Sequence, residues 1–268
     1  MRNVIPAVCL LVILAFANPS FAQVQAAKDP NAQAVLARMC SAAGWVGGAI
    51  PQDAAATGTV TRSSGNDTDT ASVTYEAKGL REFRTQINDS ADNQTYILNQ
   101  DAAVLVTPSA TQNLPVQSAL SEGPFVFPFF SVAVFAYEPD VAVQYIGTET
   151  VNGQQADKVD LLRKPGASDP LTTVRSIASH LVVWVSTSTH LPVQIQETHI
   201  ASDNPTAVAT MIRVYSDYET VNGIAMPFRQ DMSMGQNALY SIQLQSVKLN
   251  VGLTDSTFAL PAPVAAQQ

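Results

Sequence analysis

Cysteine, basic residues and long hydrophobic segments are all scarce in this chain of 268 residues. It has two cysteines, and charged residues make up 13% of it, about half the share of an average globular domain. Fourteen Lys and Arg stand against 22 Asp and Glu, giving a net charge of −8, and no run of basic residues could neutralise several phosphates. These deficits argue against a coiled coil, a disordered acidic tail and a nucleic-acid binder.

The residues that are present favour β-structure and export. Sixteen Pro and 13 Gly are scattered among Val, Ile, Thr and Tyr, which predicts many short strands joined by turns. At the N-terminus, Arg2, the uninterrupted apolar run 7–17 and the small residues at 20–22 have the pattern of a secretory signal. We expect residues 1–22 to be a cleaved signal peptide and 23–268 to form a single domain.

The apolar run is shorter than the roughly 20 residues that cross a bilayer, and no later segment replaces it. We therefore expect no further membrane anchor. Without the signal, Cys40 is the one remaining cysteine, so no internal disulfide can form. A chain of this size can bury enough surface to need none.

A helix is predicted directly after the signal. Asp29 is a good N-cap, Pro30 fits the first turn, and Gly44 ends the pattern. The helix has one apolar face, which must lie against a core: Ala32, Val35, Leu36, Met39, Cys40 and Ala43. On that face Cys40 is expected to be a small buried hydrophobe whose burial raises the thiol pKa and removes its reactivity.

The rest of the chain alternates with the period of two that is typical of strands. The alternation at 71–77 is followed by short runs at 80–87, 94–98 and 102–107, which predicts an antiparallel meander. The second half repeats Glu-Thr-Val-Asn-Gly at 149–153 and 219–223, and each Asn-Gly predicts a tight hairpin.

A further hairpin is expected between 181–185 and 191–196, and the last strands at 206–218, 224–234 and 238–251. We predict about ten strands in total, all antiparallel.

Residues 124–137 interrupt this pattern. The segment holds five of the ten phenylalanines and no charge, and Pro128 lies within it. It is too long for an ordinary strand and too short to span a membrane. Two roles fit it: a buried plug that completes the core, and a lid over an apolar cavity.

Local catalytic and metal-binding motifs are missing. The sequence has no GxSxG elbow, HExxH, P-loop or GxGxxG. His180, His190 and His199 lack the spacing of a zinc site and are expected to be exposed loop histidines. Asp67 and Asp69 fall in a polar stretch that is expected to be a solvated turn. We therefore predict no metal, no cofactor and no catalysis, although a site assembled from distant strands would leave no such motif.

The remaining candidate for a site is a set of apolar side chains that could line a binding cavity. Several strands of the meander carry large apolar side chains at alternate positions, and a curved sheet would either fill its interior with them or leave room for an aliphatic ligand. Our candidates for lining such a site are Val60, Val73, Tyr75, Phe83, Tyr96, Leu98, Val104 and Val106, together with Phe127, Phe129, Phe130 and Phe135 of the Phe-rich segment.

Three stretches resemble the superfamily of periplasmic lipoprotein carriers typified by LolA, with LolB and the sensor RseB as relatives. Residues 184–196 are similar to its strand, turn and T-x-L-P return, although Ser186 stands where an aspartate is frequent. Residues 215–232 are similar to its hairpin and P-F/Y-x strand, and residues 253–261 to its closing D-x-x-F-x-L segment. The first half of the chain carries no residue motif of the family.

The resemblance implies an α+β fold, mainly β: a curved, incomplete antiparallel barrel covered by the N-terminal helix and a helical or irregular Phe-rich lid. It implies a periplasmic, non-catalytic binding protein, expected to be a monomer, that holds acyl chains of a lipid or lipoprotein. In such carriers an arginine holds the lid by bonding backbone carbonyls; Arg62, Arg81 and Arg84 are available.

Apart from a structural component of the cell envelope, two functions stay open beside this one. The first is an interaction module or envelope-stress sensor of the RseB type, which would dock a membrane-protein partner through a sheet edge or the Phe-rich segment. The second is a hydrolase with dispersed catalytic residues.

Overall fold

The computed structural model describes residues 25–45, 51–64, 67–79, 81–89, 93–115, 128–164, 166, 172–200 and 207–261. The predicted signal peptide lies outside these ranges, as does Phe127. Within the described residues, no helix combines the length and the hydropathy needed to cross a membrane.

The N-terminal helix α1 (Pro30–Ala42) forms as the sequence predicts. The carboxylate of Asp29 accepts a hydrogen bond from the backbone N–H of Asn31 at 2.8 Å, which satisfies one of the donors left free in the first turn. The six apolar residues expected on one face are all buried. The backbone carbonyl of Ala43 accepts from the N–H of Ala225, so the end of the helix is bonded to the sheet.

One antiparallel sheet of 13 strands organises the described residues, in the order β6-β5-β4-β3-β2-β1-β13-β12-β11-β10-β9-β8-β7. The first meander contains β1 (Asp53–Ser64), β2 (Asp67–Lys78), β3 (Glu82–Asn88), β4 (Gln94–Asn99), β5 (Ala102–Val106) and β6 (Thr111–Leu114). The second contains β7 (Val141–Val151), β8 (Gln154–Arg163), β9 (Leu181–Ser186), β10 (Pro192–Ile200), β11 (Val208–Val221), β12 (Ile224–Met234) and β13 (Asn237–Leu249). Pairing of β1 with β13 joins the two meanders.

The predicted hairpins are present, whereas the predicted strand number is wrong. Asn152, Gly153, Asn222 and Gly223 all have positive φ, between 50° and 83°, as tight Asn-Gly turns require. The count of about ten is too low partly because β6, with the sequence TQNL, has no apolar alternation to reveal it.

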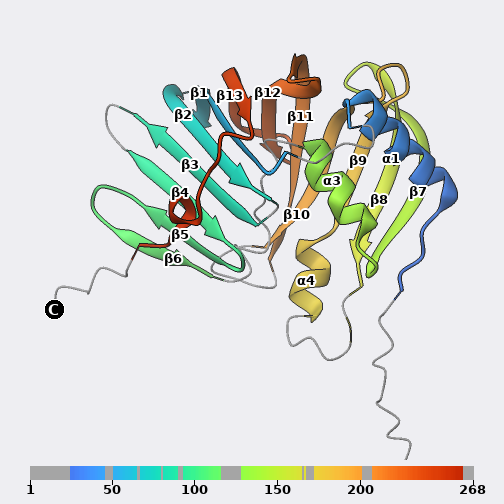
Figure 1. Cartoon of the computed structure of the whole chain (residues 1–268), viewed down its shortest axis with the longest axis horizontal. Coiled ribbons are helices and arrows are strands. Elements are labelled where there is room, and N and C mark those ends of the chain that lie inside the picture. The colour runs from blue at the N-terminus through green and yellow to red at the C-terminus, as the bar shows by residue number, and fades with distance from the viewer. Residues whose placement is uncertain are drawn as a thin grey trace, which may run out of the picture.

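The sheet is curved and does not close. It bends through β11–β13, so that β2–β5 lie on one side and β7–β9 on the other (Figure 1). A break in the β1/β13 register next to Gly58 contributes to this shape. A Cβ at that glycine would lie 2.3 Å from the carbonyl oxygen of Gln243, so only glycine allows the two backbones to approach so closely.

The edges at β6 and β7 stay separate, and β7 is hydrogen-bonded along part of its edge to residues 27–29. The predicted incomplete antiparallel barrel is therefore confirmed as a mainly β, unclosed sheet.

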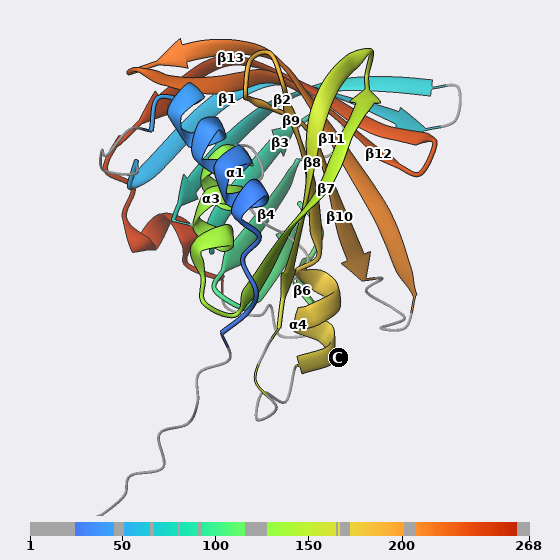
Figure 2. The same ribbon diagram turned by 90° about the vertical axis from the view of Figure 1, so that its right-hand side faces the viewer.

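Helices cover the concave side of this sheet. The Phe-rich segment forms α3 (Pro128–Tyr137), which contacts α1, β7 and β10. Figure 2 shows α1 and α3 lying in front of the strands on that side. A third helix, α4 (Thr172–Ala178), contacts β8 and β10. The short helix η1 (Asp255–Phe258) lies against β3 and β4 on the opposite face, where Asn99 Nδ2 donates to the backbone carbonyl of Phe258 at 3.1 Å.

Candidate functional site

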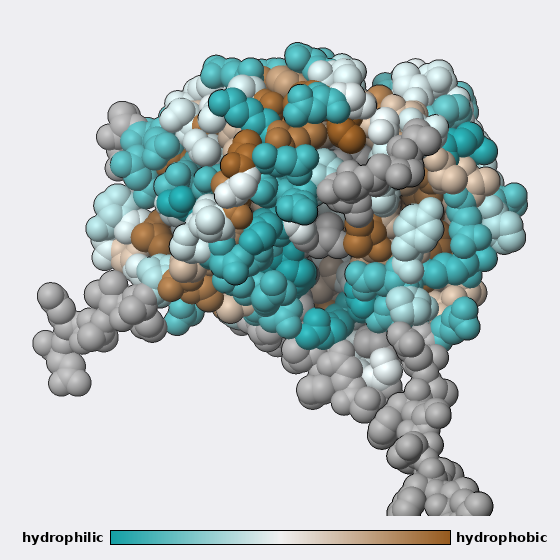
Figure 3. All heavy atoms as spheres, in the orientation of Figure 1, coloured by the Kyte–Doolittle hydropathy of each residue, from teal (hydrophilic) through white to brown (hydrophobic). Residues whose placement is uncertain are grey.

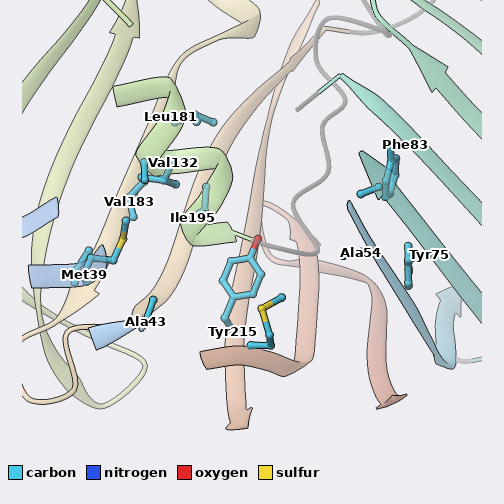
Figure 4. Close-up of a cluster of buried hydrophobic side chains, with 14 of the residues drawn as sticks. Met39, Ala43, Ala54, Tyr75, Phe83, Val132, Leu181, Val183, Ile195 and Tyr215 are labelled. Atoms are coloured by element: carbon cyan, nitrogen blue, oxygen red, sulfur yellow. The ribbon is translucent and has the colours of Figure 1, made fainter. Parts of the chain in front are cut away.

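The concave side of the sheet carries the main hydrophobic cluster. Its buried residues come from both meanders and from helices α1 and α3. In Figure 4, Met39, Val132 and Val183 lie on one side, Tyr75 and Phe83 on the other, and Tyr215 between them. On the face seen in Figure 3, hydrophobic side chains occur in small patches between hydrophilic ones. The largest apolar cluster among the described residues is therefore the buried one on the concave side of the sheet.

Most of the predicted lining residues of the first meander meet on this concave face. Val60, Val73, Tyr75, Phe83 and Leu98 are all buried there, with at most 7% of any residue exposed. Strand pairing accounts for their meeting, since Phe83 pairs with Leu98 and Ala77, and Val60 with Ala71. The rings of Tyr75 and Phe83 are stacked with centroids 6.1 Å apart.

Tyr96 and Phe135 are half-buried and pack against the same cluster. The ring of Tyr96 extends the aromatic row, with its centroid 6.4 Å from that of Phe83. Phe129 and Phe130 lie in α3, but their side chains are outside the described part of the structure, as is all of Phe127.

Val104 and Val106 lie on the opposite face of the sheet from Leu98. The turn at Gln100 and Asp101 pairs Leu98 with Ala103, and Ile97 with Val104. Directly paired residues share a face, so an even-numbered position on β4 faces the same way as an odd-numbered one on β5. The alternation within each strand was predicted correctly, but the relative register of the two strands was not.

The basic side chain that binds the C-terminal end of α3 is a lysine, not one of the three arginines named from the sequence. Lys28 Nζ donates to the backbone carbonyls of Ala136 and Glu138, each at 2.7 Å, and of Val141 at 2.5 Å. These carbonyls include some that the end of a helix leaves without intrahelical partners. Burial lowers the pKa of Lys28, and the carboxylates of Asp140 and Glu138 oppose that shift.

Arg163 adds a second hold on the same region. Its guanidinium pairs with the carboxylates of Glu138 and Asp140, the latter at 2.7 Å, and lies 5.2 Å from the ring centroid of Phe135. We call Lys28 and Arg163 the α3 clamp.

The three arginines named from the sequence have other partners. Arg62 pairs with Asp69 and Asp89, Arg81 with Asp101, and Arg84 with Glu76. Sequence reasoning missed Lys28 because no pattern distinguishes it from any lysine before a helix.

A polar cluster interrupts the concave apolar face. Arg213 on β11 donates through Nε to Glu197 on β10 and through Nη1 to the hydroxyl of Tyr240 on β13, both at 2.9 Å. The side chains of Arg213 and Glu197 are 10% and 3% exposed. Gln230 on β12, which pairs with Tyr215, is 1% exposed. These four residues, Glu197, Arg213, Gln230 and Tyr240, form what we call the polar cluster.

The polar cluster left no signal in the sequence, because its members come from four strands.

The tyrosines next to the polar cluster are un-ionised. Burial raises the pKa of Tyr75, with a further rise from Tyr240 that Arg213 opposes. Burial likewise raises the pKa of Tyr215. The phenols of Tyr75 and Tyr215 are therefore neutral at physiological pH. The charges of Arg213 and Glu197 cancel, so the polar cluster has no net charge.

The other chemical candidates of the sequence fall elsewhere. Burial raises the pKa of the Cys40 thiol to about 11, which fits the inert cysteine that we expected. His180, His190 and His199 are half-buried rather than exposed, and His199 lies within β10. Asp67 and Asp69 belong to β2, not to a turn. Across the described ranges, no group of three or more His, Cys, Asp or Glu could hold a metal ion.

Neither the family models nor the curated proteins contain a match to this chain. Among solved structures it is similar to a putative outer membrane lipoprotein-sorting protein domain from Vibrio parahaemolyticus, with 14% identity and a TM-score of 0.53 over 85% of this chain and 94% of that one. A LolA superfamily protein from Nitrosomonas europaea has 15% identity and a TM-score of 0.55 over 89% and 99%.

A DUF1329 family protein from Desulfovibrio piger has 14% identity and a TM-score of 0.52 over 85% and 96%. At these identities the likeness concerns the fold. The chain has the fold of LolA superfamily proteins, as the sequence resemblance implied.

Proposed function

We propose that this protein is a non-catalytic carrier that holds the acyl chains of a lipid or an acylated lipoprotein against its concave face. The observation that carries the proposal is the apolar cluster shared by the curved sheet and α3, with the α3 clamp at one end of that helix. A helix that packs on the apolar face and is held by a few polar contacts is suited to give way to a ligand.

The energetics of binding favour an aliphatic ligand. Each buried methylene contributes about 0.8 kcal/mol, so an acyl chain of about 14 carbons gains on the order of 10 kcal/mol before the cost of moving α3. The ligand would replace contacts that Val132, Ala133 and Ala136 of α3 now make with the cluster. A highly charged ligand would bind poorly, because the two charged side chains of the polar cluster, Arg213 and Glu197, already pair with each other.

The carrier would act in the periplasm. This assignment rests on the signal predicted at residues 1–22 and on the lipoprotein-sorting description of one protein with the same fold. Its acidic balance, with a net charge of −8, would disfavour lasting attachment to anionic membranes.

Uptake of a fluorescent fatty acid tests the proposal. We expect saturable binding near one to one, displaced by unlabelled fatty acid, and a copurifying lipid mass in native mass spectrometry. Phe135→Asp should lower affinity at least about tenfold, because it puts a charge against the apolar cluster. Tyr137→Asp is the matched control on the same helix, since Tyr137 is 67% exposed.

Two outcomes would overturn the carrier. One is folded wild-type protein that neither copurifies with lipid nor takes up the probe. The other is recovery of one stoichiometric protein partner without lipid, which would favour the interaction module instead. Circular dichroism of both variants separates loss of binding from loss of folding.

A further inference from the structure

We propose that the buried carboxamide of Gln230 recognises the end of the acyl ligand, and that this end is a neutral, planar group with a hydrogen-bond donor beside an acceptor. The protonated carboxyl of a free fatty acid and a primary fatty amide share this chemistry. The inference rests on the proposed carrier function and names its ligand class.

Gln230 is placed to meet a ligand on the concave face. It pairs with Tyr215 on β11 and Ile242 on β13, and both partners belong to the concave apolar cluster. The residue is 1% exposed, and within the described part of the chain neither its Nε2 nor its Oε1 has a hydrogen-bond partner. Buried polar atoms nearly always have partners, so an amide with both ends unmet indicates a group that is still to bind.

A second buried glutamine, Gln194, has a hydrogen-bond partner for its side chain. Gln194 on β10 is 9% exposed and faces the other way, paired with Trp184, which belongs to a separate hydrophobic cluster. Its Oε1 accepts a hydrogen bond from Nδ2 of Asn152 at 3.3 Å. Gln194 is therefore a matched control for Gln230: the same side chain, in the same sheet, with a partner of its own.

Charge balance selects a neutral ligand end. The nearest register row on the same face holds Arg213, Met232, Tyr240 and, on β1, Arg62. Arg62 is paired with the carboxylates of Asp69 and Asp89. Arg213 is already paired with Glu197, so the charged residues of the polar cluster sum to zero. A carboxylate or phosphate would have to give up its hydration beside Glu197 without a cation of its own, whereas a neutral group avoids that cost.

The geometry of a carboxamide selects the kind of neutral group. Its N–H and C=O lie side by side in one plane, so a protonated carboxyl or a primary amide can donate to Oε1 and accept from Nε2 at the same time. An ester only accepts, and leaves Oε1 without a donor. Because an unsatisfied buried acceptor is costly, the ester should bind more weakly although its chain is the same.

Four ligands of one chain length test the inference on the intact mature protein: hexadecanamide, hexadecanoic acid, methyl hexadecanoate and N,N-dimethylhexadecanamide, each displacing a fluorescent fatty acid. We expect the primary amide to bind about 10- to 100-fold more tightly than the methyl ester and the dimethyl amide, which lacks N–H donors. The acid and the primary amide, measured separately, reveal which of the two ends the protein prefers.

Gln230→Leu should remove this preference and raise the thermal unfolding midpoint, because it removes two unmet buried polar atoms. Gln194→Leu should leave the preference unchanged. If wild-type protein binds amide and ester equally, or Gln230→Leu keeps the difference, the inference is overturned while the carrier function stands. If no ligand binds at all, both fall. The dimethyl amide tests the same hydrogen bonds without a substitution, so a variant that fails to fold does not prevent the test.

Discussion

At the residue scale, His180 is the titratable group whose pairing is easiest to measure. Its Nε2 lies 2.6 Å from a carboxylate oxygen of Asp160 on β8. The hydrogen bond with Asp160 raises the pKa of His180 above its ordinary value of 6.5, against the opposing effect of partial burial. The charged imidazole is therefore more stable in the folded chain than in the unfolded one.

This pairing predicts a pH dependence with a definite sign. The stabilisation is present in full below about pH 6.5 and is lost as the pH rises through the raised folded-state pKa of His180. His180→Gln should therefore destabilise the protein at pH 5.5 but hardly at pH 8.5. Because the side chain is 38% exposed, solvent screening limits the effect to about 0.5 kcal/mol.

Urea unfolding of wild type and His180→Gln at the two pH values checks this prediction. His190→Gln is the control, since His190 lies in a turn and pairs with no carboxylate among the described residues. An equal loss of stability at both pH values would contradict the account of the His180–Asp160 pair.

Single residues also mark where prediction from the sequence stops. Alternation along each strand was enough to place Val73 and Leu98 among the core residues, because one face of each strand must be apolar. Placing Val104 on the same face as Leu98 failed, because the register across a turn depends on pairing and not on alternation. Gln230 and Arg213 could not be anticipated as neighbours, since nothing local links residues on separate strands.

At the element scale, the α3 clamp holds the C-terminal end of α3. Its apolar residues pack on the concave cluster, while Lys28 binds three carbonyls at its C-terminal end and in the turn that follows. Apolar packing is not directional, whereas hydrogen bonds are. The directional hydrogen bonds of the α3 clamp fix its position.

Removing the lysine should loosen this helix. Lys28→Met keeps much of the apolar length of the side chain but loses all three hydrogen bonds, which we expect to cost about 1–3 kcal/mol of local stability. Backbone amides of residues 132–137 should then exchange hydrogen for deuterium at least about fivefold faster. Hydrogen exchange measured by mass spectrometry tests this directly.

Lys158→Met is the matched control. Lys158 lies 4.8 Å from the ring centroid of Trp184 and pairs with Glu149, remote from the clamp. Unchanged exchange in α3 for Lys28→Met, or equal acceleration in both variants, would contradict the clamp.

Sequence patterns predicted elements well where local chemistry determines them. The cap at Asp29 and the two Asn-Gly turns depend on residues within a few positions, and all are found where expected. For the segment that forms α3, the sequence left two roles undecided, a buried plug and a lid, because hydrophobicity alone does not show what a helix covers. The short polar strand β6 pairs with β5 through its backbone, which no side-chain pattern reveals.

At the scale of the whole molecule, the two meanders form one concave surface because β1 pairs with β13. The fold could be anticipated from three stretches in the second half of the chain, although the first half carried no motif. A curved sheet with a shared apolar face can therefore be built from a first meander whose sequence is not recognisably similar.

Photolabelling with a diazirine-bearing fatty acid tests the central claim that the acyl chain lies against the concave face. Peptide mass spectrometry should place the label on concave residues of both meanders, such as Tyr75, Phe83, Val183 and Tyr215, and excess unlabelled fatty acid should abolish it. Labelling confined to the opposite face of the sheet, around Trp184 and Val104, or no specific labelling of folded protein, would contradict the account.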